Sequence, residues 1–115
     1  MRFDLLVQGA PLPTGAPERA LRFARAAVDA RHQIGRIFFY NEAVTLANRF
    51  AADDSRTREK LAQLASEAGF ELAVCVTAAA RRGIVAKESL ADGFVIVGLG
   101  QLIEAIEDGD RLVSF

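Results

Sequence analysis

Five short apolar runs, separated by helical patterns, dominate this sequence. They span residues 3–8, 33–40, 70–75, 94–97 and 111–115, and they are rich in Val, Ile and Phe, which favour strands. Amphipathic or Ala-rich segments lie between them. Strands that alternate with helices are typical of a parallel sheet covered on both faces. The sequence therefore predicts an α/β fold of three layers, α/β/α, around a five-stranded, mostly parallel sheet.

Length and composition describe an ordinary folded domain. The chain has 115 residues, of which 51% are hydrophobic and 25% are charged. This is long enough to bury a core without staples, so we expect residues 1–115 to form one domain. Eight Phe residues leave much apolar surface to hide. Because obligate interfaces are more apolar than ordinary surface, we expect an oligomer.

Charge and cysteine usage exclude several classes of protein. The 14 basic and 15 acidic residues are mixed along the chain, whereas nucleic-acid binding normally requires a clustered basic patch. A single cysteine excludes an internal disulfide and a multi-cysteine zinc site. The start lacks a signal-peptide pattern, and no apolar run approaches the length of a membrane span. We expect a cytoplasmic protein that contacts neither nucleic acid nor membrane directly.

Capping patterns predict the limits of several helices. The segment 9–15, GAPLPTG, holds two prolines and two glycines and predicts an irregular loop before a helix that begins near Pro17. Asn41 predicts the N-cap of a helix that runs to residue 50, and Ser55 predicts the cap of a helix over 57–68. The charged residues at the start of that last helix predict a solvated face: Arg56, Arg58, Glu59 and Lys60.

The only thiol, Cys75, falls at the junction between a predicted strand and a short helix that ends before Gly83. In an open α/β sheet such junctions form the ligand crevice. A helix N-terminus presents free N–H groups and favours a thiolate, which is the nucleophilic form of cysteine. A buried, chemically inert cysteine is the alternative, because free cysteine is among the most buried residue types.

Other candidate residues surround this junction in the predicted fold. If the strands are parallel, Tyr40 and Asn41 lie at the same sheet edge as Cys75, where packing and capping are their alternative roles. Thr77 could cap the helix or hydrogen-bond the sulfur, and capping is the commoner role. Arg81 and Arg82 could dock an acidic partner surface or belong to a solvated face. The only histidine, His32, is expected to be a solvated residue at a helix end.

Motifs for cofactor chemistry are absent or incomplete. Gly98 and Gly100 follow a strand, but Ile103 occupies the place of the third glycine of a dinucleotide-binding motif. The chain holds no phosphate-binding P-loop and no G-x-S-x-G elbow. We therefore expect no cofactor and no metal. A lone thiolate can still accept a sulfane sulfur from a persulfide and pass it to another thiol, by the displacement logic of thiol–disulfide exchange.

Five sequence blocks resemble the DsrE family of sulfurtransferase subunits. They are MRF-x-LLV-x-G, FFYNEAVTLAN, VCVTAAARRGIV, FVIVGLGQLIEA and the terminal DRLVSF, and they cover nearly the whole chain in order. VCVTAAARRG is the specific block, and the family cysteine that carries a persulfide matches Cys75. The family fold is a five-stranded parallel sheet between helices.

The resemblance also implies partners and a pathway. It implies a heterohexamer with TusB-like and TusC-like subunits, a TusA-like sulfur donor and a TusE-like acceptor, in the 2-thiolation of a tRNA wobble uridine. The segment between Asn48 and Phe70 is shorter than in relatives, and Asn41 stands where a basic residue is expected, so partner contacts could differ.

Three alternatives stay open at this point. One is a DsrE-type subunit of dissimilatory sulfur oxidation. Another is a non-catalytic assembly subunit whose cysteine is buried. The third is a small flavodoxin-like binder of nucleotide or flavin.

Overall fold

A computed structural model describes residues 1–115 and contains a five-stranded sheet in which every strand pairing is parallel. The elements, in chain order, are β1 (Arg2–Val7), α1 (Pro11–Thr14), α2 (Ala16–Asp29), β2 (Gln33–Phe39), the 3₁₀ segment η1 (Asn41–Ala47), α3 (Thr57–Ala68), β3 (Glu71–Cys75), α4 (Val76–Arg81), β4 (Phe94–Val97), α5 (Leu99–Asp108) and β5 (Arg111–Ser114). The predicted α/β class and the five strands are confirmed.

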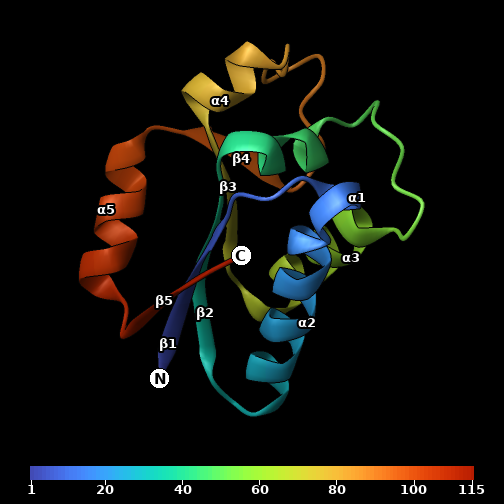
Figure 1. Cartoon of the computed structure of the whole chain (residues 1–115). Helices are drawn as coiled ribbons and strands as arrows, with labels where there is room; N and C mark the ends of the chain where they lie inside the picture. The colour runs from blue at the N-terminus through green and yellow to red at the C-terminus, as the bar shows by residue number, and fades with distance from the viewer.

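The strand order is β4-β3-β2-β1-β5. The chain steps outward from β1 to β4, and then crosses back through α5 to place β5 beside β1 (Figure 1). Helices α2 and α3 cover one face of the sheet, whereas α5 lies alone on the other (Figure 1). Helix α4 and η1 lie at the carboxyl ends of the strands, which is where ligands bind in open α/β sheets.

The core is built from apolar side chains that adjacent strands bring into register. Leu5 pairs with Ile37, Ile37 pairs with Leu72, and all three are fully buried. Helix α2 contributes a row of small buried residues: Ala16, Ala20, Ala24 and Ala27. None of the helices is both long and apolar enough to cross a lipid bilayer.

The predicted loop over 9–15 is wrong in part, because its centre forms the single helical turn α1. Pro11 stands at the start of this turn, where a missing N–H leaves no bond unmade. The hydroxyl of Thr14 donates to the carbonyl of Ala10 at 2.6 Å. Gly15 then adopts a left-handed conformation, with a φ of 65°, and connects α1 directly to α2.

Asn41 is not the predicted N-cap. The segment after β2 forms 3₁₀ turns, with Tyr40 in the capping position and no side-chain cap. Asn41 itself has a φ of 49°, and its Nδ2 donates to Oε1 of Gln8 at 2.8 Å. A contact to the loop after β1 therefore replaces a local cap, and the segment ends at Ala47 instead of residue 50.

Helix α3 matches its predicted residues, but Ser55 does not cap it. The carboxylate of Asp53 accepts hydrogen bonds from the N–H groups of Arg58 and Glu59, at 3.1 and 3.4 Å. The solvated face is also wrong at Arg58, whose guanidinium donates to three carbonyls of the preceding loop: Leu46, Asn48 and Ala51. Arg56, Glu59 and Lys60 are exposed, as predicted.

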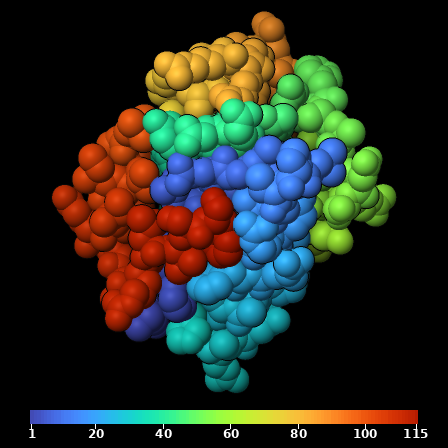
Figure 2. Space-filling view, in the orientation of Figure 1, coloured from blue at the N-terminus to red at the C-terminus, as the bar shows by residue number.

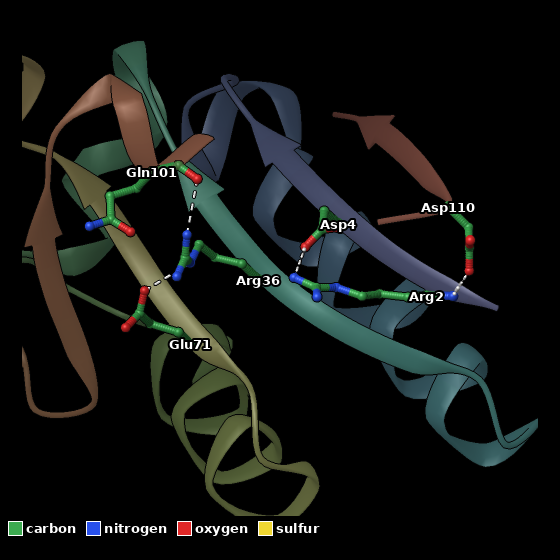
Figure 3. A network of polar contacts seen from close by, with 6 residues as sticks. All are labelled: Arg2, Asp4, Arg36, Glu71, Gln101 and Asp110. Carbon is green, nitrogen blue, oxygen red and sulfur yellow. Dashed lines mark hydrogen bonds and ion pairs between the residues drawn. The ribbon is translucent and has the colours of Figure 1, made fainter. Parts of the chain in front are cut away.

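A row of charged side chains crosses the α5 face of the sheet, away from the carboxyl ends of the strands (Figure 3). Nη2 of Arg2 lies 3.5 Å from Oδ1 of Asp4, and Nε of Arg36 lies 2.9 Å from Oε1 of Glu71. Arg36 also donates to the carbonyl of Gln101 in α5 at 3.0 Å. The last of these contacts attaches α5 to β2.

Asp4 is the most buried charge of this row, with 1% of its surface exposed. Burial raises the pKa of Asp4 above its ordinary value, and the positive charges of Arg2 and Arg36 offset this only in part. The backbone of Gly35 lies against the same group, since a Cβ at this position would overlap the side chains of Arg2 and Asp4. A glycine here is required by close approach and not by φ.

Candidate functional site

A pocket of about 590 Å³ opens at the carboxyl ends of β2 and β3. It is lined by Tyr40, Asn41, Glu42, Cys75, Thr77, Ala78, Arg81, Arg82 and Leu99. All six residues singled out in the sequence are among them. The structure thus gathers in one hollow Tyr40, Asn41 and Cys75, which a parallel sheet was predicted to bring to one edge, together with Thr77, Arg81 and Arg82.

The pocket follows from the pairing of two neighbouring strands. Phe39 pairs with Val74, so β2 and β3 end at the same level of the sheet. Each strand continues at once into a short helical segment, η1 after β2 and α4 after β3. The space-filling view shows the two segments as adjacent bands, α4 in yellow above η1 in teal (Figure 2). Residues of both segments line the pocket.

Cys75 is the last residue of β3 and occupies the N-cap position of α4. It is a free thiol with only 1% of its surface exposed, although it lines the pocket. The first N–H groups of a helix have no intrahelical acceptor. Those of α4 begin at Val76, directly after the thiol.

The two arginines of the pocket have different environments. Arg82 is half-buried; its Nη2 lies 2.6 Å from Oε1 of Glu42, and its Nη1 donates to the carbonyl of Ala78 at 3.3 Å. Arg81 is exposed and makes neither an ion pair nor a side-chain hydrogen bond. Only Arg81 is therefore free to meet an anionic group without breaking an internal contact.

The remaining predicted residues line the walls. Thr77 is exposed, and no side chain caps α4, so its predicted capping role is wrong. Tyr40 is half-buried and packs against the core, whereas Asn41 is held by Gln8. Both wall residues thus have structural contacts and still face the pocket.

Sequence reasoning missed Glu42 and Leu99 as pocket residues. Glu42 was visible only as an acidic residue in the first turn after β2, and its partner Arg82 lies 40 residues away. Leu99 opens α5, which approaches the pocket from the opposite face of the sheet. Neither contact has a local sequence pattern.

His32 lies apart from these residues. It is exposed after α2, with its ring edge-on to Phe3 at a centroid distance of 5.5 Å, in agreement with the predicted helix-end position. No group of three or more His, Cys, Asp or Glu side chains is placed so that it could hold a metal ion. The pocket itself holds one thiol, that of Cys75, and the charged side chains of Glu42, Arg81 and Arg82.

Known proteins resemble the chain over its whole length. The DsrE/DsrF-like family model matches residues 1–115. The DsrE protein of Allochromatium vinosum is 38% identical over 128 aligned positions, which cover 100% of this chain and 98% of that protein. Sulfurtransferase TusD of Yersinia pestis strain Pestoides F is 39% identical, with the same coverage.

The aligned length exceeds the 115 residues of this chain, so these relatives carry residues without a counterpart here. This agrees with the expected shortening, although the comparison does not locate it.

Solved structures support the fold. The ychN protein from E. coli superposes with a TM-score of 0.83 at 24% identity and full coverage of both chains. MTH1491 from Methanobacterium thermoautotrophicum gives a TM-score of 0.69 at 15% identity, with 97% of each chain covered. Similarity to named sulfurtransferases over the full length places this protein among the sulfurtransferases. The chain belongs to the DsrE/DsrF-like family.

Proposed function

We propose that Cys75 carries sulfur between proteins as a persulfide. The observation that carries this proposal is the position of the only thiol, in a pocket at the carboxyl ends of two neighbouring strands and beside an unpaired arginine. Residues 1–115 would act as one domain, with Cys75 as the nucleophile.

The reaction consists of two displacements. The Cys75 thiolate attacks the outer sulfur of a donor persulfide, a new S–S bond forms, and the donor leaves as a thiolate. An acceptor thiolate then attacks the outer sulfur on Cys75, and the Cys75 thiolate is regenerated. Neither step requires an external oxidant or reductant, because the sulfane sulfur moves unchanged in oxidation state.

Several features of the pocket support this chemistry. The free N–H groups at the start of α4 can stabilise the sulfur anion, as helix N-termini do for other anions. Arg81 supplies a positive charge at the pocket surface. Thr77 is exposed in the same pocket as Cys75, and its hydroxyl is free to donate a hydrogen bond to the sulfur. A reduced, cytoplasmic compartment would keep this single cysteine as a thiol.

The partners follow from the resemblance. We assign TusB-like and TusC-like subunits as assembly partners, a TusA-like protein as donor and a TusE-like protein as acceptor, for 2-thiolation of a tRNA wobble uridine. Exposed apolar side chains on α5 support assembly: Leu99, Ile103 and Ile106. The resemblance also implies a second candidate pathway, dissimilatory sulfur oxidation with a DsrE-type subunit, and the relative from Allochromatium vinosum, named DsrE, has almost the same identity as TusD.

Intact mass tests the carrier role directly. After exposure to a protein persulfide, the native chain should gain one sulfur atom that a reductant removes, and Cys75→Ser should gain none. Cys75→Ser combined with Ser66→Cys moves the thiol to an exposed site on α3 and serves as the matched control. If this control transfers sulfur to an acceptor as well as the native chain does, the pocket has no role.

The burial of Cys75 favours one competing function, a non-catalytic subunit with a structural thiol. In that case Cys75→Ser would keep sulfur transfer in the assembled complex. Loss of transfer with normal assembly would exclude it. Mass spectrometry of tRNA nucleosides, in cells with and without the gene, would then separate tRNA thiolation from sulfur oxidation.

A further inference from the structure

Cys75 lines the pocket but is almost completely buried. The thiol is 1% exposed. Each displacement nevertheless requires a sulfur atom of another protein to reach the Cys75 side chain, with the attacking, central and leaving sulfur atoms in line. Two walls flank it, η1 after β2 and α4 after β3. Of the three pockets in the structure, only the one between these walls is lined by Cys75.

A single ion pair ties these walls together. Oε1 of Glu42 in η1 lies 2.6 Å from Nη2 of Arg82, the residue that follows α4. The arginine is anchored to its own wall, because its Nη1 donates to the carbonyl of Ala78. The glutamate side chain is 65% exposed, against 27% for that of Arg82. Glu42 is therefore the half of the pair that can move out into solvent, whereas Arg82 stays on its own wall.

The charges at the pocket do not balance. Arg81 and Arg82 face one carboxylate, Glu42, among the residues that line the hollow. Arg81 is exposed and has no partner, so the pocket carries an excess positive charge. An approaching anionic side chain is attracted to this site and can compete with Glu42 for Arg82.

We propose that the Glu42–Arg82 ion pair is a gate over Cys75, and that an acidic group on the sulfur-exchanging protein opens it by replacing Glu42. This inference rests on the proposed function, since it assigns the control of the same thiol. Glu42 acts through Arg82 and is a positioning residue. An exposed ion pair is weak enough to open reversibly, with a rate effect of about two- to fivefold.

Alkylation of Cys75 by neutral iodoacetamide tests the gate without any sulfur transfer. The rate is measured across pH in the native chain and in Glu42→Gln. A gate predicts a two- to fivefold higher plateau at alkaline pH, where all the thiol is ionised and the charge removed in the variant no longer affects ionisation. Glu59→Gln is the matched control, because Glu59 pairs with Arg56 on the exposed surface of α3.

Two further measurements keep the test decisive. High salt should raise the native rate towards that of Glu42→Gln and leave the variant unchanged, because salt screens exposed pairs. Glu42→Asp, which keeps the carboxylate, should be labelled more slowly than Glu42→Gln and closer to the native rate. An equal plateau in the native chain and Glu42→Gln, or a change confined to the inflection, would overturn the gate and leave the carrier role of Cys75 untouched.

The acidic opener is tested with a hexaglutamate peptide at low salt. The peptide should accelerate iodoacetamide labelling of the native chain and have no effect on Glu42→Gln. Slower labelling of both proteins would show that the peptide blocks the pocket, and would overturn opening by an acidic group.

Discussion

The two ends of the sheet use charge in opposite ways. Away from the carboxyl ends, the charged row of Figure 3 is closed on itself: Arg2 faces Asp4, and Arg36 faces Glu71 beneath α5. At the carboxyl ends, Arg81 has no partner and lines an open pocket beside Cys75. Charges that face one another inside the chain are not available to another molecule, whereas an unpaired charge in the same pocket as the thiol is.

Removing the thiol should affect sulfur transfer far more than it affects stability. Cys75→Ser is expected to abolish sulfur transfer, because the chain has no other thiol. Burying a hydroxyl in place of the sulfur should lower the free energy of unfolding by only about 1–2 kcal/mol. Single-turnover transfer and urea unfolding measure the two effects. Transfer by Cys75→Ser above the rate of donor and acceptor mixed without this protein would contradict the assignment of Cys75.

A change at the opposite end should give the reverse result. In Gly35→Ala, the new Cβ must displace the side chains of Arg2 and Asp4, and overpacking of this kind costs about 1–3 kcal/mol of stability. Cys75 alkylation in the folded state should stay at the native rate. Gly100→Ala is the control, since a Cβ there meets no atom within 4 Å. Equal stability of the two variants would show that the row tolerates rearrangement.

Asp4→Asn tests how the contribution of this buried carboxyl to stability depends on pH. Because burial raises its pKa, Asp4 keeps its proton to a higher pH in the folded chain than its value of 3.8 in the unfolded chain. Its stabilising contribution is complete below that value and is lost as pH rises through the folded pKa. The stability of the native chain relative to Asp4→Asn should fall over this window, by at most about 1.4 kcal/mol per pH unit.

Urea unfolding of both proteins at several pH values measures this difference. A stability difference that stays constant, or that grows in favour of the native chain as pH rises, would mean that Arg2 and Arg36 outweigh the burial of Asp4.

The smallest effect is expected at Arg81. Arg81→Ala should leave stability within about 0.5 kcal/mol of the native value, because the side chain is exposed and unpaired. Transfer from a protein donor should slow about three- to tenfold at low salt and less at high salt, since exposed charges mainly change association rates. Stopped-flow transfer measures this, with Arg25→Ala on α2 as an exposed control. Equal rates for both variants would remove Arg81 from docking.

Much of the fold could be predicted because its determinants are local. Apolar runs and helical periodicity located the five strands, and helix α3 matches its predicted residues. The place of Cys75 at a strand end follows from the same patterns. Prediction failed where another contact took the place of the expected cap: Asn41 binds Gln8, which is distant in the chain, and Asp53, only two residues before Ser55, accepts the N–H of Arg58 at α3.

In the site, too, local patterns could be predicted and contacts between distant segments could not. Its six predicted residues come from two segments that each follow a strand, so parallel pairing was enough to bring them together. Glu42 was missed because its role depends on Arg82, on a different segment. The unpaired state of Arg81 was equally hidden, because an arginine in the sequence does not reveal whether a carboxylate reaches it.

By itself, the sequence determined the five strands, helix α3, the parallel arrangement of the strands and the position of the single thiol, because neighbouring residues specify these elements. Only the tertiary structure decided the strand order β4-β3-β2-β1-β5, the burial of Cys75 and the Glu42–Arg82 pair across its pocket. Each of these depends on which distant side chains pack together once the sheet has formed. Burial and pairing are therefore set by the whole fold and not by any one segment.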